Sequence, residues 1–185
     1  MVHPALGLSS ANRRLLPEIT KALQFFHKQK MKLDAPGMVW FQAMLLKPTD
    51  LQAEALAKRL MLSRDEQKIV VQHAKHYPAL LKDLGSKKVT PSRMHRLLSP
   101  LAPEVQCFLL AAAKPVVRKK MTDYFVKMKN LKPWLRGRDL KQFGIPPGFR
   151  YSYILLEALN GQLDGRFKSR KEVVQWVRKT FVPAG

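Results

Sequence analysis

A short segment near the C-terminal end of the chain carries residue types that can bind a phosphate group. It reads Leu135-Arg-Gly-Arg-Asp-Leu-Lys-Gln-Phe-Gly-Ile-Pro-Pro-Gly148 and runs directly into Phe149-Arg-Tyr-Ser-Tyr-Ile-Leu-Leu156. Gly144 can adopt the left-handed conformation that ends a helix, and the two prolines that follow prevent the helix from continuing. Gly148 would open a second helix, whose first backbone N–H groups are unpaired and carry partial positive charge. Such a helix end accepts a phosphate without side-chain chemistry.

Cations and aromatic rings flank this turn and could extend the phosphate site. Four basic side chains could neutralise phosphate oxygens, namely Arg136, Arg138, Lys141 and Arg150. Two aromatic residues after Gly148 could stack on nucleic-acid bases, namely Phe149 and Tyr151. Tyr153 directly precedes an apolar run, so packing within the tail is at least as good an interpretation for that ring.

The net charge predicts a polyanionic partner. The 185-residue chain has 34 Lys and Arg residues against 13 Asp and Glu, a formal net charge of +21. A field of this strength attracts nucleic acid first and an anionic membrane second. A basic surface without a partner is the less favoured alternative, because such a field itself binds nucleic acid non-specifically.

Other catalytic and metal-binding patterns are missing from the sequence. There is no H-E-x-x-H, paired C-x-x-C, P-loop or G-x-G-x-x-G motif, and the acidic residues are too scattered to hold paired metal ions. His73 and His76 lie three residues apart, but no further ligands complete a site. We therefore expect no catalytic, cofactor-binding or metal-binding residues in this chain.

The cysteine content and the lack of long apolar stretches favour a cytoplasmic protein. The single cysteine, Cys107, lies in an apolar run and cannot form an internal disulfide, which fits a buried thiol in a reducing compartment. No apolar stretch is long enough to span a bilayer, and the N-terminus lacks the pattern of a signal peptide.

Apolar residues recur at helical spacing along almost the whole chain, and no alternating strand pattern is present. Before the C-terminal part, helices are predicted at about residues 15–26, 38–46, 49–60, 63–75, 78–84, 90–98, 104–113 and 115–130. Thr49, Thr90 and a capping box at Ser63 and Glu66 mark three of the starts. Pro78 is expected to begin a helix of its own after a break near residue 75.

The helix predicted at residues 115–130 is both amphipathic and basic. Its apolar stripe is expected to pack in the core and comprises Val117, Met121, Tyr124, Met128 and Leu131. One basic edge groups Lys114, Arg118, Lys129 and Lys132. A solvated helix face would normally mix the two signs of charge, so phosphate contact is the preferred interpretation and a solvated face the alternative.

The segment Lys132-Pro133-Trp134 marks an expected domain boundary. We predict an all-α fold, with a multi-helix body domain at residues 1–132 and a smaller helical tail domain at residues 133–185. In the tail, the phosphate-binding turn leads into a helix at about residues 148–160, a turn at residues 161–165 and a last helix capped by Ser169.

Residues 135–172 resemble a known family. The runs L-R-G-R-D-L-K-Q-F-G-I-P-P-G, Y-S-Y-I-L-L-E-A-L and Q-L-D-G-R-F-K-S-R-K-E are similar to the C-terminal tail of bacterial tRNA nucleotidyltransferases, the class II CCA-adding enzymes and their poly(A) polymerase-like relatives. The resemblance implies an all-α body and tail that grip the tRNA backbone along the acceptor and T arms. tRNA or another structured RNA is therefore the expected partner.

The same resemblance implies a missing part. The family's catalytic head has a Gly-rich strand and loop with paired metal-binding aspartates, and its neck reads the incoming nucleotide. None of these patterns occurs here. The chain therefore resembles an excised or separately encoded C-terminal portion, inactive alone, and Mg²⁺ and nucleotide would belong to a separate head.

Two other functional classes remain open at this point. A DNA-binding helical protein could use a helix-hairpin-helix-like tail, although it would not need the 2′-hydroxyl and A-form shape that distinguish RNA. A role at an anionic membrane or as a protein scaffold would require the apolar stripe at residues 117–131 to be exposed, whereas we expect it to be buried.

Overall fold

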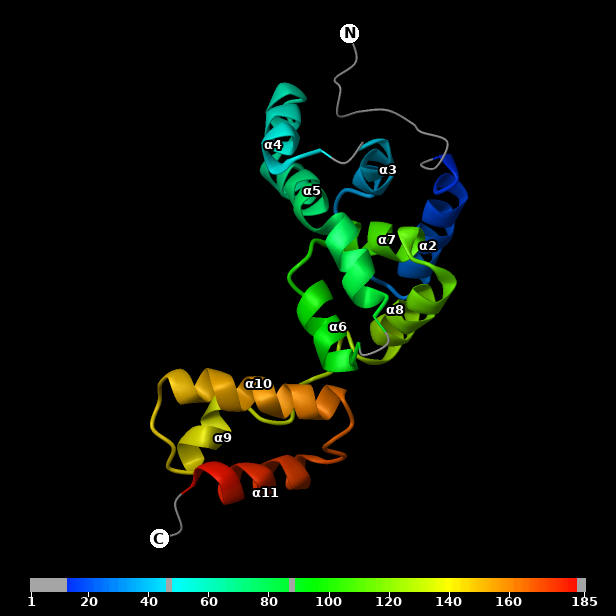
Figure 1. The fold of residues 1–185 in the computed structure, drawn as a ribbon. Helices are drawn as coiled ribbons and strands as arrows, with labels where there is room; N and C mark the ends of the chain where they lie inside the picture. The colour runs from blue at the N-terminus through cyan, green and yellow to red at the C-terminus, as the bar shows by residue number, and fades with distance from the viewer. Residues whose placement is uncertain (1–12, 46–47, 87–88, 183–185) are drawn as a thin grey trace.

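A computed structural model describes residues 13–45, 48–86 and 89–182, and the predicted all-α fold is confirmed for them. Figure 1 shows an upper group of helices, the body, and a smaller lower group, the tail. The body helices are α2 (Leu16–Lys28), α3 (Gly37–Met44), α4 (Asp50–Arg59), α5 (Arg64–Leu84), α6 (Pro91–Leu98), α7 (Pro103–Ala112) and α8 (Pro115–Lys127). The tail helices are α9 (Gly137–Gln142), α10 (Phe149–Leu163) and α11 (Arg170–Phe181).

Helix α7 is the centre of the body. It is apolar around its whole circumference, and a helix of that kind is stable only when it is covered on all sides. Helices α2, α3, α5 and α8 pack around it. Phe108 and Leu109 of α7 are among the largest fully buried side chains, and Val117, Met121 and Tyr124 of α8 join the same core, as their spacing predicted.

The tail has a separate hydrophobic core. Leu140 of α9, Ile154 of α10 and Val177 of α11 are fully or almost fully buried in it. The division at residues 132 and 133 stays a prediction, and the presence of two distinct cores agrees with it.

A polar joint connects the two parts. The Ser92 backbone N–H and hydroxyl, at the start of α6, donate to the two carboxylate oxygens of Asp164 at 2.8 and 2.7 Å. Gln162 holds the segment that connects the body to the tail. Its Nε2 donates to the Lys132 carbonyl at 3.0 Å, and its Oε1 accepts the Trp134 N–H at 3.1 Å. Figure 1 shows that α10 runs from the outer end of the tail to this joint beneath α6.

The predicted helix starts are confirmed where a cap was recognisable. Thr49 and Ser63 each form a capping box with the residue three positions later. The Thr90 hydroxyl accepts the Arg93 N–H at 3.3 Å, and the Ser169 hydroxyl accepts the Glu172 N–H at 3.3 Å. These starts could be predicted because the cap and its acceptor are neighbours in the sequence.

The predicted break between residues 75 and 78 is wrong. Helix α5 continues through Pro78 to Leu84. A proline inside a helix removes one hydrogen bond and crowds the preceding turn. Apolar residues on both sides of it, Val70 before and Leu84 after, are buried in the body core, so tertiary packing holds the helix together.

The predicted end of α10 at residue 160 is also wrong, because the helix continues to Leu163. Gly161 lies inside the helix for a packing reason. A Cβ atom at this position would lie 2.4 Å from the Phe167 ring and 2.8 Å from Nε of Arg166. Gly165 makes the actual turn, with a positive φ of 74°.

No helix among the described residues is long and apolar enough to cross a membrane.

The Gly161→Ala variant should lose stability, because Phe167 would have to leave its packed position. We expect the free energy of unfolding to fall by about 1–3 kcal/mol, as for other overpacked sites. The matched control is Gly37→Ala, because a Cβ atom at Gly37 has nothing within 4 Å. Urea denaturation of both variants measures the difference, and equal stability would contradict the packing explanation.

Burial of His73 should make the body sensitive to acid. The ring is stacked on Tyr77, with its Nδ1 3.2 Å from Gln42 Oε1, and burial lowers its pKa to about 4. Below the ordinary histidine pKa of about 6.5 the unfolded chain binds a proton that the folded chain does not bind until about pH 4. This contribution is complete above about pH 6.5 and disappears as the pH falls towards 4, for a loss of about 3 kcal/mol.

Urea denaturation between pH 7 and pH 4 measures this slope. His73→Gln keeps a donor for Gln42 and should flatten the pH dependence relative to the parent. His76→Gln, three residues away on the same helix, should keep the parental slope. Parallel pH profiles for the parent and His73→Gln would show that His73 is not the acid-sensitive group.

Candidate nucleic-acid interface

The predicted helix–turn–helix segment is present, and its geometry is specific. At the end of α9, the Gly144 N–H donates to the Lys141 carbonyl at 3.1 Å and the Ile145 N–H donates to the Leu140 carbonyl at 3.2 Å. Gly144 has a positive φ of 74°. These two bonds are the Schellman pattern, and the buried Leu140 and Ile145 supply the apolar contact that accompanies it.

Gly148 begins α10 in a conformation that favours glycine. Its φ is 153° and nothing lies within 4 Å of the position where a Cβ atom would stand. No side chain caps the helix at this position. The Tyr151 N–H donates to the Gly148 carbonyl at 2.9 Å, and no described residue accepts a hydrogen bond from the Phe149 or Arg150 N–H. These two amide groups are the donors that a phosphate oxygen could accept.

Four exposed cations accompany this helix end in the sequence of the turn: Arg136, Arg138, Lys141 and Arg150. The ion pairs found among the described residues involve none of these four side chains. Their charges are therefore not neutralised within the chain, and they can meet an external anion.

An ion pair between the buried Asp139 and the exposed Arg170, which sequence reasoning missed, holds the turn in place. Asp139 is buried, and one of its oxygens accepts the Arg136 N–H at 2.7 Å. The other oxygen pairs with Nη2 of Arg170 at 2.8 Å, and Nε of Arg170 donates to the Trp134 carbonyl at 3.2 Å. Arg170 lies 31 positions beyond Asp139, so no local pattern could reveal this pair.

The aromatic residues divide into exposed and structural rings. Phe149 is 91% exposed beside the open amides, as a base-stacking residue must be. Tyr151 is half-buried, and its hydroxyl donates to the Ile145 carbonyl at 2.8 Å, so it fastens the turn to α10. Tyr153, for which packing was at least as good an interpretation as stacking, is 54% exposed and contacts Phe181 edge-on. Tyr153 is therefore a better stacking candidate than Tyr151.

Arg118, predicted to contact phosphate, is engaged inside the body. Its guanidinium pairs with the Glu18 carboxylate and donates to the carbonyls of Leu110, Ala111 and Ala113 at 3.3, 2.9 and 3.1 Å. It therefore satisfies the carbonyl groups at the C-terminal end of α7, where a cation is favoured by the helix dipole. The hydrogen bond from Lys21, and with it the charge of Arg118, lowers the pKa of Glu18.

Lys129 is likewise packed against the body core. Its Nζ lies 5.7 Å from the Phe26 ring centre and 5.5 Å from that of Phe125, and it donates to Gln106 Oε1 at 3.2 Å. This partial burial lowers the pKa of Lys129. The predicted basic edge of α8 therefore does not exist as a single surface, since only Lys114 and Lys132 of its four members are exposed.

Metal and thiol chemistry find no support in the described part of the chain. No group of three or more His, Cys, Asp or Glu side chains there could hold a metal ion. Burial, with the nearby Glu104 carboxylate, raises the pKa of Cys107 to about 12, so its thiol stays protonated at neutral pH.

Comparison with known proteins identifies relatives of this arrangement. The A-adding tRNA nucleotidyltransferase of Geobacter sulfurreducens (strain ATCC 51573 / DSM 12127 / PCA) is 26% identical over 179 residues, which is 92% of this chain and 20% of that protein. The Thermotoga maritima CCA-adding enzyme, solved in complex with tRNA, has a TM-score of 0.78 and 21% identity, covering 96% of this chain and 43% of that one. A CCA-adding enzyme solved with CTP has a TM-score of 0.75, also at 21% identity, covering 98% of this chain and 43% of that one.

The fold of the chain is thus that found in the C-terminal portion of CCA-adding enzymes. The sequence similarity confirms the predicted resemblance to the C-terminal region of tRNA nucleotidyltransferases. The chain spans about a fifth of the curated relative and less than half of each solved chain. No protein-family model matches the sequence.

Replacing Arg118 tests whether this cation is structural. Arg118→Ala would leave three carbonyl groups without their donor and Glu18 with Lys21 as its remaining cation, so we expect the free energy of unfolding to fall by about 1–3 kcal/mol. The matched control is Lys119→Ala, an exposed neighbour on the same helix. tRNA binding, measured well below both melting temperatures, should change by less than about two-fold for each variant. If Arg118→Ala instead weakened tRNA binding while keeping the stability of the parent, the predicted phosphate contact of Arg118 would be supported.

Proposed function

We propose that this chain is the RNA-binding C-terminal part of a tRNA nucleotidyltransferase or poly(A) polymerase-like protein. It grips the backbone of tRNA so that a separate catalytic head can add nucleotides to the 3′ end. Nucleotide addition, with its Mg²⁺ and its nucleotide substrate, belongs in this proposal to that head. The chain works in the cytoplasm, where tRNA is processed.

The observation that carries the proposal is the open N-terminal end of α10. Uncapped amide groups, Gly148 with its positive φ and the exposed ring of Phe149 stand together at this point. Exposed cations precede and follow it in the chain, including Arg138 and Arg150. Amide groups and cations bind phosphate groups whatever the base sequence, and the ring can stack on any base. The site therefore suits recognition of an RNA backbone and of an unpaired base in an RNA loop.

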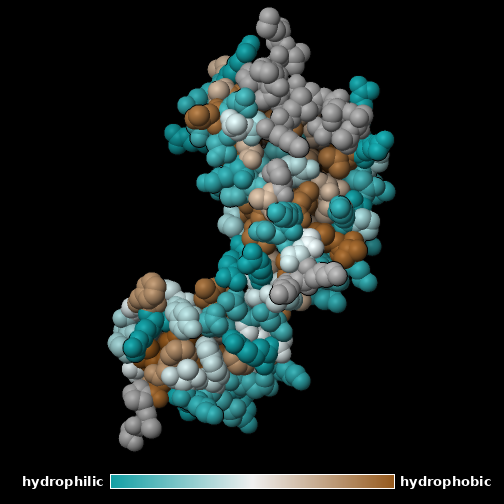
Figure 2. Space-filling model, viewed as in Figure 1, coloured by the Kyte–Doolittle hydropathy of each residue, from teal (hydrophilic) through white to brown (hydrophobic). Residues whose placement is uncertain are grey.

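The shape of the molecule supports an extended nucleic acid as the ligand. Figure 2 shows that the outline narrows where the body meets the tail, which leaves a concave side between the two parts. The joint between Ser92 and Asp164 sets the angle of this concavity. A rigid concave surface with cations at its outer end favours one helical shape over another, which is how proteins select double-stranded RNA.

DNA binding remains the second candidate, because amides and cations attract any phosphate backbone. The likeness to a CCA-adding enzyme solved with tRNA favours RNA. Competition between tRNA and duplex DNA of equal charge separates the two. Equal affinity for both would favour the DNA-binding alternative.

Removing the turn cations should weaken tRNA binding and flatten its salt dependence. We expect the triple variant Arg138→Ala, Lys141→Ala and Arg150→Ala to bind tRNA at least about ten-fold more weakly at low salt. Because three phosphate contacts would be lost, the slope of log affinity against log salt concentration should decrease by about 2 to 3. Titrations at several salt concentrations measure both quantities.

The matched control removes three exposed cations at the opposite end of the molecule: Lys58→Ala, Arg59→Ala and Arg64→Ala. Figure 1 places α4 and the start of α5 far from the tail. Both triple variants lose the same net charge, so a general effect of charge would weaken them equally. Equal losses would therefore refute a specific site at the turn.

A further inference from the structure

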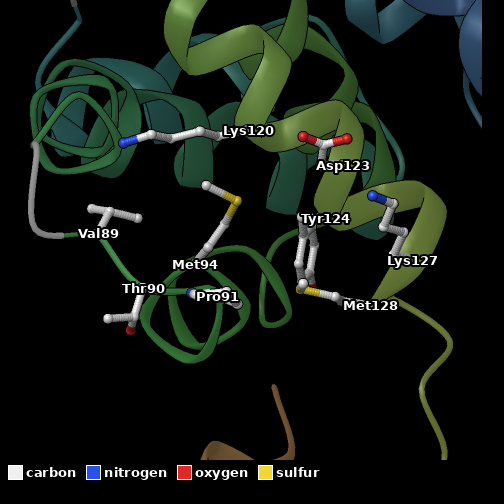
Figure 3. Close-up of a pocket in the computed structure, with 9 residues that line it drawn as sticks. All are labelled: Val89, Thr90, Pro91, Met94, Lys120, Asp123, Tyr124, Lys127 and Met128. Atoms are coloured by element: carbon white, nitrogen blue, oxygen red, sulfur yellow. The ribbon is translucent and has the colours of Figure 1, made fainter. Parts of the chain in front are cut away.

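A cavity on the body, between α6 and α8, is lined by residues that the proposed tRNA-binding site does not use. Its volume is about 290 Å³. Figure 3 shows the side chains around it, with α8 above and the start of α6 below. The cavity lies close to the joint with the tail, since Ser92, next to the lining residue Pro91, bonds to Asp164.

The inner surface of the cavity is apolar and adaptable. Met94 and Met128 supply two thioether groups, and the largely buried Tyr124 also lines the cavity. The hydroxyl of Tyr124 lies 3.0 Å from His95 Nδ1 and is therefore already satisfied. Methionine side chains adjust to flat groups and their sulfur atoms contact aromatic rings favourably, so this surface suits a planar heteroaromatic ring.

The rim of the cavity is charged. Lys120 and Lys127 stand on either side of it, and Asp123 lies between them on the same helix. Lys127 and Asp123 are exposed, and the ion pairs found among the described residues include neither of them. Lys120 Nζ donates to the Ser86 carbonyl at 3.4 Å, so Lys127 is the rim cation that can meet an anionic group. The carboxylate of Asp123 can accept hydrogen bonds from hydroxyl or amino groups.

The size of the cavity limits the ligand. Pockets that hold drug-sized molecules measure roughly 300 to 1,000 Å³, and this one is at the lower end of that scale. One ring system with its sugar fits such a space, whereas a stretch of several nucleotides or a peptide helix does not.

We propose that this cavity binds a single nucleoside monophosphate unit. The base lies against Met94, Met128 and Tyr124. The phosphate meets Lys127, and Asp123 accepts hydrogen bonds from the sugar hydroxyls. The unit is either an unpaired nucleotide of the bound RNA or a free nucleotide. The inference rests on the proposed RNA-binding function only for the first of these sources.

Methyl NMR of the protein labelled at its methionines tests the proposal directly, with AMP, adenosine and inorganic phosphate as probes. AMP should shift the signals of Met94 and Met128 and leave that of Met61, which is 91% exposed on another helix end, unchanged. Adenosine should bind more weakly than AMP, and phosphate alone should leave the methyl signals in place.

Comparing Lys127→Ala with Lys119→Ala distinguishes a direct contact at the rim of the cavity from the general effect of the protein's positive charge. Both residues are exposed on α8, but only Lys127 lines the cavity. Loss of one charge-assisted contact should weaken AMP binding by about five-fold or more in Lys127→Ala, against less than about two-fold in Lys119→Ala. Equal effects of the two variants, or equal binding of AMP and adenosine, would overturn the phosphate position.

Adding tRNA to the AMP complex identifies the source of the nucleotide. Displacement of AMP at the Met94 and Met128 signals supports an RNA nucleotide in the cavity, and retention of AMP beside bound tRNA supports a free nucleotide. If AMP leaves both signals unchanged while the parent binds tRNA with a steep salt dependence, the cavity proposal fails and the proposed function stands. If AMP binds but tRNA does not, the proposed function fails and the nucleotide site stands.

Discussion

The scarcity of carboxylates is the constraint on which this structure depends. Only 13 acidic residues accompany 34 basic ones, so each acid that forms an internal contact leaves the surface more positive. Glu104 is buried in the body and accepts the N–H groups of Asp34 and Ala35 at 2.8 and 3.0 Å. Asp139 does the same for the turn in the tail, and Asp164 joins the two parts. Acids in these positions stabilise the chain, and few remain to neutralise the exposed cations.

This use of the acids links stability to function. A carboxylate that accepts backbone N–H groups in a buried place is worth more than one in an exposed ion pair. Asp139 therefore does two things, because it holds the turn and leaves Arg138 and Lys141 without an acidic partner beside them. The joint at Asp164 links the tail to the start of α6 in the body through two hydrogen bonds. The same scarce carboxylates thus connect the parts of the fold and leave the cations of the turn exposed.

Local features of the fold could be predicted from the sequence, and features that depend on distant partners could not. The Schellman turn at Gly144 and the caps at Thr49 and Ser63 are built from residues within six positions of one another. Helix α5 passes through Pro78 because of packing on both sides, which no local pattern expresses. Gly161 was wrongly predicted to be a turn residue, because its real role also depends on packing. The Phe167 ring requires a glycine at this position of α10, and that ring approaches only in the folded tail.

The candidate site shows the same limit at the level of charge. The sequence shows that a residue is basic but does not show whether its charged group is exposed on the surface. Arg118 and Arg138 look alike in the sequence, but one bonds to carbonyl groups from α7 and the other is exposed. The cavity at α8 was missed in a related way. Its apolar stripe was correctly predicted to be core at Met121 and Tyr124, whereas Met128 is only half-buried against the core and also lines the cavity. Where a core stripe ends in a half-buried residue beside an exposed lysine, the same residues that stabilise the fold can also bind a ligand.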